Sequence, residues 1–534
     1  MMPYRLPLPL SFPEETCAPA ACQESFIPTG AQTAKQTNPH SCLRPKRLRQ
    51  AILTLSAATF LTAGCNVGPK YVVPTAPVPP AYKELGPNAF KEGENTSWTQ
   101  ARPIDSIPRG SWWTVFNDPQ LNELEPRVEQ ANQTLREADA NLRAARAIIT
   151  VRKADRYPTV GINPYNSTQG YNANSPYFNP AQPQSTAQTL QFPLQFSYEV
   201  DLWGQIRRNI AAGVEESQAT AADRVNVLLS LQTELAVDYF ELRSADAQQK
   251  LLNDVVAQYQ EAVRITTNRY LGGVAIKADV TQAQTQLETA RVAASDEEII
   301  RQQYEHAIAA LIGEAPAQLT IPFSPLPVDT QPPLIPTGLP SQLLERRPDI
   351  AAAERRAQEG NEAIGIAQSA FYPQIVLGAS AGYQSTATLQ SVFSPASVVY
   401  SLGPGIAYTF FEGGRRKGVK QESLAQFDRN AANYKQTVIT AFQQTEDNLV
   451  ALRVLADEQV QQRNATDAAL ESQRIFNNRY VGGVDTFLQV ITAQTSALAA
   501  ERNDIDILRR RMDATVNLVK ALGGGWDRTQ LPPS

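Results

Sequence analysis

The sequence predicts a mixed α/β membrane protein that consists mainly of long α-helices, with four transmembrane β-strands per chain and an internal duplication. Three observations support this fold class. A seven-residue segment at 268–274 recurs at 478–484, which is an offset of about 210 positions. Two long segments, one in each copy, alternate apolar and polar residues, which is typical of strands. Two stretches of about 60 residues instead place apolar side chains every three to four positions, which indicates helices.

The first 64 residues are predicted to be a leader that contains a lipoprotein signal peptide. An apolar run at 51–63 follows a basic cluster and ends shortly before Cys65. This order is typical of a secretory signal, and about 13 apolar residues are too few to span a bilayer as a helix. The segment 61–65 resembles a bacterial lipobox, which implies a covalent lipid on Cys65. An ordinary signal peptide with an incidental cysteine stays open, and so does the true translation start within the leader.

The rest of the chain is expected to contain two repeats, and both have their elements in the same order. Each repeat has a helix, two strands, a long helix, a glycine-containing tip and a last helix. The expected parts are an N-terminal extended segment (65–120), the first repeat (121–312), a proline-rich linker (313–339), the second repeat (340–522) and a C-terminal tail (523–534). Within the first repeat we expect a helix at 121–156, strands at 158–171 and 187–202, a long helix at 205–267, a tip at 268–274 and a helix at 275–312. Within the second we expect a helix at 340–371, strands at 374–385 and 397–411, a long helix at 415–477, a tip at 478–484 and a helix at 485–522.

The predicted strands are suited to the wall of a transmembrane barrel. From 190 to 202 apolar and polar residues alternate, so that all the apolar side chains share one face. Strands of this length with one apolar and one polar face are typical of outer-membrane barrels, although a soluble sheet covering a core is the alternative. Four strands cannot close a barrel, and lipid tolerates no open sheet edge. The chain is therefore expected to oligomerise, and this arithmetic alone allows eight strands from two subunits or twelve from three.

The two long helices extend far beyond the size of a domain core. About 62 residues at 1.5 Å each give a length of roughly 93 Å. Their apolar residues form a coiled-coil seam that is diluted with Ala, Ser, Thr and Asn, and their other faces are rich in Gln and Asn. Such polar faces suit the wall of a solvent-filled tube, and a solvated coiled-coil tether is the alternative.

A glycine pair ends each long helix, since glycine permits the backbone angles that terminate a helix. We expect each pair to form the tip of a helical hairpin, at the end farthest from the strands. An arginine and a tyrosine precede both pairs, which favours a docking role over a loose surface turn. The predicted docking residues are Arg269, Tyr270, Gly272 and Gly273 in the first tip, and Arg479, Tyr480, Gly482 and Gly483 in the second.

The composition argues against an enzyme, a metal protein and a nucleic-acid binder. The chain has only two histidines and four cysteines, and three of the cysteines fall in the predicted leader. No nucleophile–base pair, phosphate loop or metal-ligand cluster is visible in the sequence. The formal net charge of -5 makes a nucleic-acid partner unexpected. We therefore expect no catalytic residues, no metal and no cofactor other than the lipid.

A series of short motifs runs through the chain in a fixed order. Gly68-Pro69-Lys70-Tyr71 follows Cys65, and Trp112-Trp113, Phe116, Asp118-Pro119 and Leu121 come next. Asp201-Leu202-Trp203-Gly204 precedes the first long helix, Glu345 to Ile350 opens the second repeat, and Phe411 to Arg416 opens the second long helix. In this order the motifs resemble those of the TolC-like outer-membrane efflux proteins, most closely the lipoprotein branch that serves resistance-nodulation-division (RND) pumps.

The resemblance implies a homotrimer with a twelve-stranded β-barrel in the outer membrane and a periplasmic α-helical tunnel. It implies that a periplasmic adaptor protein engages the tips and that an inner-membrane RND-type pump supplies the energy. The channel would be a passive conduit for drugs or other small toxic compounds, and so contribute to antibiotic resistance. A type I secretion duct of the same fold, or a structural coiled-coil lipoprotein without channel activity, is the alternative.

The chain departs from the family pattern at the predicted aperture. Many members carry an aspartate shortly after the second tip, where the corresponding positions here are Gln489 and Thr492. Leu488 fits the apolar constriction of the relatives, and the first copy retains Asp279 near its tip. We expect Leu488 packing and tip hydrogen bonds, rather than a carboxylate ring, to hold this aperture closed. Because carboxylates attract cations in a narrow pore, cation selectivity should be weaker here.

Overall fold

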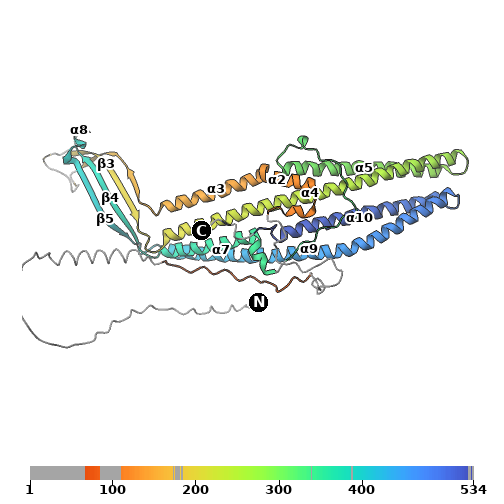
Figure 1. The fold of residues 1–534 in the computed structure, drawn as a ribbon. Coiled ribbons are helices and arrows are strands. Elements are labelled where there is room, and N and C mark those ends of the chain that lie inside the picture. The colour runs from red at the N-terminus through yellow and green to blue at the C-terminus, as the bar shows by residue number, and fades with distance from the viewer. Residues whose placement is uncertain are drawn as a thin grey trace, which may run out of the picture. The chain divides into compact units, whose positions relative to one another are not determined.

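The computed structural model describes residues 66–84, 110–171, 174, 181, 185–337, 340–386, 389–526 and 531. The predicted leader and the predicted lipid on Cys65 lie outside these residues. The described part consists mainly of helices with one antiparallel sheet (Figure 1). Within it, none of the helices combines the length and the apolar character needed to cross a membrane.

The sheet joins strands from both repeats. Its strands are β1 (Thr159–Ile162), β2 (Tyr165–Tyr171), β3 (Ser185–Glu199), β4 (Gln374–Ser385) and β5 (Val398–Ala407). Both β1 and β2 pair with β3, which pairs with β4, which pairs with β5 (Figure 1). Four rows of strand therefore lie side by side, with β1 and β2 together forming one row.

The register of the sheet places apolar residues in lateral rows on one face. Leu194 pairs with Ile162 on one side and Ala381 on the other, and Ala381 pairs with Tyr400. The next row of the same face joins Val160, Phe196, Ala379 and Leu402 in the same way. The large side chains of both rows are exposed in the chain. The row between them holds Gly161, Gln195, Ser380 and Ser401, so the opposite face is polar.

The prediction of one unbroken strand over 158–171 was wrong. The strand is interrupted between β1 and β2 at Asn163 and Pro164. Proline has no backbone N–H to donate to a neighbouring strand. The predicted strands at 187–202 and 397–411 also extend too far, because β3 ends at Glu199 and β5 at Ala407.

The long helices are α4 (Gln205–Leu271) and α9 (Arg415–Val481), each of 67 residues. At 1.5 Å per residue each is about 100 Å long. The return helices are α5 (Lys277–Leu311) and α10 (Phe487–Ala521), each of 35 residues. Asp201 fixes the start of α4, because its carboxylate accepts hydrogen bonds from the backbone N–H groups of Ile206 and Arg207 at 3.2 and 3.0 Å.

The first helix of each repeat is divided where the sequence analysis predicted one continuous helix. The first consists of α2 (Pro119–Ala131) and α3 (Gln133–Ala154), separated by Asn132. The side chain of Asn132 caps α3 by accepting from Leu135 N at 3.1 Å. The second consists of α6 (Leu343–Arg346) and α7 (Pro348–Ser369). Arg347 between them is extended, because the residue before a proline avoids helical angles.

The core lies where the two repeats meet along the helices. Helix α4 packs against α3, α5, α7 and α10, and α9 packs against α7 and α10 (Figure 1). Trp112, in the short helix η1 (Trp112–Phe116), is buried there with Tyr239 and Leu508. The described part of the proline-rich linker is tied to this core, since Leu326 N donates to Arg243 O at 3.0 Å.

Candidate functional site

The two hairpin tips have the same backbone geometry. In the first tip, Gly272 N donates to Asn268 O at 3.0 Å and Val274 N to Arg269 O at 2.9 Å. The second tip repeats both bonds 210 positions later, at 2.9 Å each. Gly273 and Gly483 have φ angles of +73° and +77°, which favour glycine. The glycine pairs therefore form tight turns between long helices, as the sequence predicts.

The arginines of the two tips have different partners. Arg479 pairs with Asp485 of its own tip. The corresponding position in the first tip is Ala275, which offers no carboxylate. Arg269 instead reaches across to the second tip, where its Nη1 donates to the Tyr480 carbonyl oxygen at 2.7 Å. Its guanidinium also lies 4.5 Å from the centre of the Tyr480 ring, which adds a cation–π contact. One arginine therefore links the two hairpins of the chain.

The two tyrosines also differ in burial. Tyr270 is 43% exposed, whereas Tyr480 is only 6% exposed. The Tyr480 ring packs against Phe487 with a centroid separation of 5.2 Å, and Ile491 belongs to the same apolar cluster. Burial raises the pKa of the Tyr480 hydroxyl, the positive charge of Arg269 opposes this rise, and the negative charge of Asp279 adds to it. Of the predicted docking pair, Tyr270 is thus available at the surface and Tyr480 belongs to the contact between hairpins.

Three of the four predicted aperture residues, Leu488, Gln489 and Thr492, share one open face of α10. Phe487, Val490 and Ile491 are buried against the rest of the chain. Leu488 is 64% exposed, and Gln489 and Thr492 are exposed beside it.

The hydroxyl of Thr492 donates its hydrogen bond within α10, to Leu488 O at 2.9 Å. Asp279 is half-buried in the first turn of α5. The open face of α10 therefore presents the side chains of Leu488, Gln489 and Thr492. None of these three side chains is a carboxylate.

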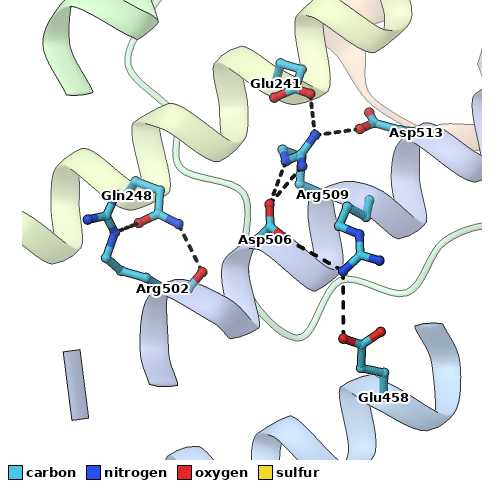
Figure 2. A network of polar contacts seen from close by, with 8 residues as sticks. Glu241, Gln248, Glu458, Arg502, Asp506, Arg509 and Asp513 are labelled. Atoms are coloured by element: carbon cyan, nitrogen blue, oxygen red, sulfur yellow. Dashed lines mark hydrogen bonds and ion pairs between the residues drawn. The ribbon is translucent and has the colours of Figure 1, made fainter. Parts of the chain in front are cut away.

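A network of charged residues joins α10 to α4 and α9 farther from the tips (Figure 2). Arg509 pairs with Glu241 of α4 and, within α10, with Asp506 at 2.8 Å and Asp513 at 3.0 Å (Figure 2). Arg510 lies 3.7 Å from Glu458 of α9.

Further along the same interface, Arg502 Nε donates to Gln248 Oε1 at 3.0 Å, and Gln248 Nε2 returns a bond to Arg502 O at 3.1 Å (Figure 2). The pKa of Asp513 is raised to about 7, mainly by burial and next by the negative charge of Glu241. Burial and neighbouring carboxylates likewise raise the pKa of Asp238 to about 7.

A second network fixes the start of the proline-rich linker. Arg301 of α5 pairs with Asp246 of α4 at 2.7 Å and with Glu305 at 2.6 Å. It also donates to Ile321 O of the linker at 2.7 Å. Asp246 is fully buried and accepts a further bond from Ser324 N at 2.8 Å. The linker is therefore bound to the helices by hydrogen bonds to a buried ion pair.

Asp485 and Phe487 are not among the predicted site residues, yet their contacts with Arg479 and Tyr480 distinguish the second tip from the first. Both differences are visible when the copies are aligned at an offset of 210, because Asp485 replaces Ala275 and Phe487 replaces Lys277. Elsewhere, within the described residues, no group of three or more His, Cys, Asp or Glu side chains is arranged to hold a metal ion.

The sequence profile of a family described as "Outer membrane efflux protein" matches the chain over residues 125–314 and again over 339–524. The chain is 31% identical over 484 residues to the "Probable efflux pump outer membrane protein TtgC" of Pseudomonas putida, covering 90% of this chain and 96% of the relative. It is also 31% identical over 474 residues to the "Outer membrane protein OprJ" of Pseudomonas aeruginosa, covering 88% of this chain and 94% of the relative.

The fold is similar to that of a solved outer-membrane channel. The structure of the outer-membrane channel OprN superposes with a TM-score of 0.77 at 28% sequence identity. The superposition covers 86% of this chain and 100% of OprN.

Proposed function

Because the chain belongs to the outer membrane efflux protein family, and so is a TolC-like outer-membrane exit channel of the kind that serves RND pumps, we propose that it works as a passive homotrimer. In this proposal three chains form a twelve-stranded barrel in the outer membrane and a helical tunnel in the periplasm. The cargo is a drug or another small toxic compound, delivered by an adaptor protein and an inner-membrane pump.

The exposed apolar face of the sheet carries the proposal. Two lateral rows, which include Leu194, Phe196 and Leu402, place large apolar side chains on one face without burying them in the chain. A soluble sheet would cover a core with this face, whereas lipid can cover it in a barrel wall. Within the described strands, β5 and the β1–β2 row pair on one side only. Since lipid tolerates no open edge, we infer that these edges pair between neighbouring chains.

The open face of α10 suits the narrow end of the tunnel. Leu488, Gln489 and Thr492 would meet their counterparts from two other chains near the trimer axis. Three leucines can close such an aperture by apolar contact, and the link from Arg269 to Tyr480 would hold the hairpins in the closed arrangement. Tyr270 and Leu271, both exposed beside the first glycine pair, are the residues we propose for contact with the adaptor.

A lipid on Cys65 would anchor the chain near the junction of strands and helices. Val67 N donates to Trp203 O at 3.2 Å, immediately before α4 begins. Trp203 Nε1 in turn donates to Pro373 O at 2.7 Å, immediately before β4 begins. We propose that acyl chains on Cys65 enter the inner leaflet at this level. Loss of labelling by a radiolabelled fatty acid in Cys65→Ser, with normal export of the protein, is the expected result.

The oligomer and its conductance can be tested in one preparation. The purified protein should migrate as a heat-resistant species of three chains in a semi-native gel, and it should give single-channel steps in a planar bilayer. A monomer without conductance would overturn the proposal. The relative TtgC is named as part of an efflux pump, which favours an efflux channel over a type I secretion duct.

A further inference from the structure

Two cavities lie at equivalent places in the two repeats, where strands give way to helices. The cavity of the first repeat measures about 320 Å³ and is lined by Tyr157 and Gln205. The cavity of the second repeat measures about 400 Å³ and is lined by Tyr372 and Arg415. Tyr372 follows Tyr157 by 215 positions and Arg415 follows Gln205 by 210, the offsets of the repeats themselves. The two cavities are therefore corresponding sites of the duplicated unit.

The charges of the two cavities are opposite. Asp155 and Glu199 line the first cavity, and their counterparts in the second are the neutral Ala370 and Thr409. Conversely, Arg415 and Arg416 line the second cavity, where the first has Gln205 and Ile206, and Glu412 is the one carboxylate among the residues that line the second cavity. The first cavity is therefore acidic and the second is basic.

The two arginines of the basic cavity differ in their contacts. Arg416 is fully engaged: it pairs with Glu412 at 3.1 Å, donates to Thr409 O and lies 5.3 Å from the centre of the Tyr408 ring. Arg415 is exposed, and no carboxylate of the described residues lies within ion-pair distance of it. Arg416 thus shapes the wall, and the guanidinium of Arg415 is available to an anion.

The surroundings of Arg415 combine free cations with exposed aromatic rings. Lys417 and Lys420 follow on the first turns of α9, and neither has an ion-pair partner among the described side chains. Phe410 and Phe411 precede the helix and are 92% and 88% exposed in the chain. Aromatic rings next to lysine and arginine are typical of the boundary between the apolar interior of a membrane and its headgroups.

We propose that the basic cavity of the second repeat binds the phosphate of an anionic phospholipid headgroup, with Arg415 as the main contact. The inference rests on the proposed function, which puts the strands in the membrane and the helices in the periplasm. The neighbouring phenylalanines favour a lipid over a free phosphate ion, because a free ion would make no contact with apolar rings. The excess of positive charge favours an anionic headgroup over a zwitterionic one. The acidic cavity of the first repeat does not bind this headgroup.

Native mass spectrometry of the purified full-length protein tests the proposal with phosphatidylglycerol and phosphatidylcholine of equal chain length. The unaltered trimer should retain phosphatidylglycerol preferentially. Arg415→Gln, which installs the residue of the first repeat, should reduce that preference about 5-fold. The matched control is Arg429→Gln, the same change at an exposed position about 21 Å farther along α9. It should leave the preference unchanged. Arg416 stays intact in both variants because it holds the wall together.

Three results would overturn the inference. The first is an unchanged preference in Arg415→Gln, and the second is an equal loss in Arg429→Gln. The third is complete displacement of the lipid by millimolar inorganic phosphate, which would make the cavity a site for free anions. Semi-native gels and single-channel recordings of the same samples separate this inference from the channel itself. Conducting trimers that retain both lipids equally would overturn only the lipid site, whereas failure to form conducting trimers would overturn both.

Discussion

Removing the Arg269 side chain should loosen the contact between the two hairpin tips. Arg269 is the only residue of the first tip whose side chain, within the described hydrogen bonds, donates to the second tip. In Arg269→Ala the Tyr480 carbonyl oxygen loses its charged donor at 2.7 Å, and the Tyr480 ring loses the guanidinium 4.5 Å from its centre. The hairpins of each chain should then separate more readily, and the aperture should open more often.

The free energy that Arg269→Ala removes can be worked out from these two contacts. A hydrogen bond from a charged donor contributes about 1.5–3 kcal/mol, and an exposed cation–π contact about 0.5–1 kcal/mol. Arg269 is half-buried, so the lower ends apply and together give about 2 kcal/mol per chain. That free energy corresponds to roughly a 30-fold shift in the opening equilibrium of each hairpin pair. If the three pairs open together, the effect on the trimer is larger still.

Single-channel recording in planar bilayers measures this effect as open probability and mean conductance. Arg269→Ala should raise both, and Arg269→Lys should give an intermediate value because lysine keeps the charge without the planar fork. Arg479→Ala is the matched control, since Arg479 pairs with Asp485 within its own exposed tip. The reasoning is refuted if Arg269→Ala conducts like the unaltered channel, or if Arg479→Ala opens the channel as much.

Three further predictions concern stability and selectivity. Arg301→Ala should destabilise the chain by about 3–5 kcal/mol, because it leaves the buried carboxylate of Asp246 without its ion pair; thermal unfolding in detergent measures this, and a loss below 1 kcal/mol would contradict it. The pKa values of Asp238 and Asp513 are raised from 3.8 to about 7, so the folded state holds protons that the unfolded state has released, and stability should fall as pH rises from about 4 to about 7. Asp513→Asn should flatten that dependence, and an unchanged slope would refute the assignment. Gln489→Asp should add a carboxylate from each chain at the aperture and increase cation selectivity; an unchanged reversal potential in a salt gradient would contradict the placement of Gln489 in the pore.

Local chemistry made most of the fold predictable. The long helices were predicted at 205–267 and 415–477, and the observed helices differ only by four residues at their C-terminal ends. Glycine pairs marked those ends because few other residues accept the required angles. Strand β4 was predicted at its observed bounds, Gln374–Ser385.

The errors have identifiable causes in single residues. Asn132 interrupts a helical pattern that was read as continuous, although asparagine is a common capping residue. Pro164 interrupts a strand because it lacks a donor, and Pro348 separates α6 from α7 through its effect on Arg347. Each of these residues was visible in the sequence, and the apolar periodicity around them outweighed their local signal.

The different roles of the two tips could not be read from periodicity alone. Tyr270 and Tyr480 stand in local sequences that differ only at Leu271 and Val481 over seven residues, but only Tyr480 packs against Phe487 and under Arg269. Burial here depends on which hairpin lies next to which, and that is a property of the tertiary arrangement. The sequence signal for the difference lies in comparing Ala275 with Asp485 and Lys277 with Phe487.

Thiol modification of Leu488→Cys tests most directly the central claim that the chain is a conduit that narrows at this residue. The variant is recorded in a planar bilayer while a positively charged methanethiosulfonate reagent is added on the tip side. We predict that the current falls irreversibly, because three modified side chains would meet in the aperture. The matched control Tyr270→Cys, exposed on the other tip, should react without loss of current. Absence of channel current, or a current in Leu488→Cys that the reagent leaves unchanged, would contradict the account.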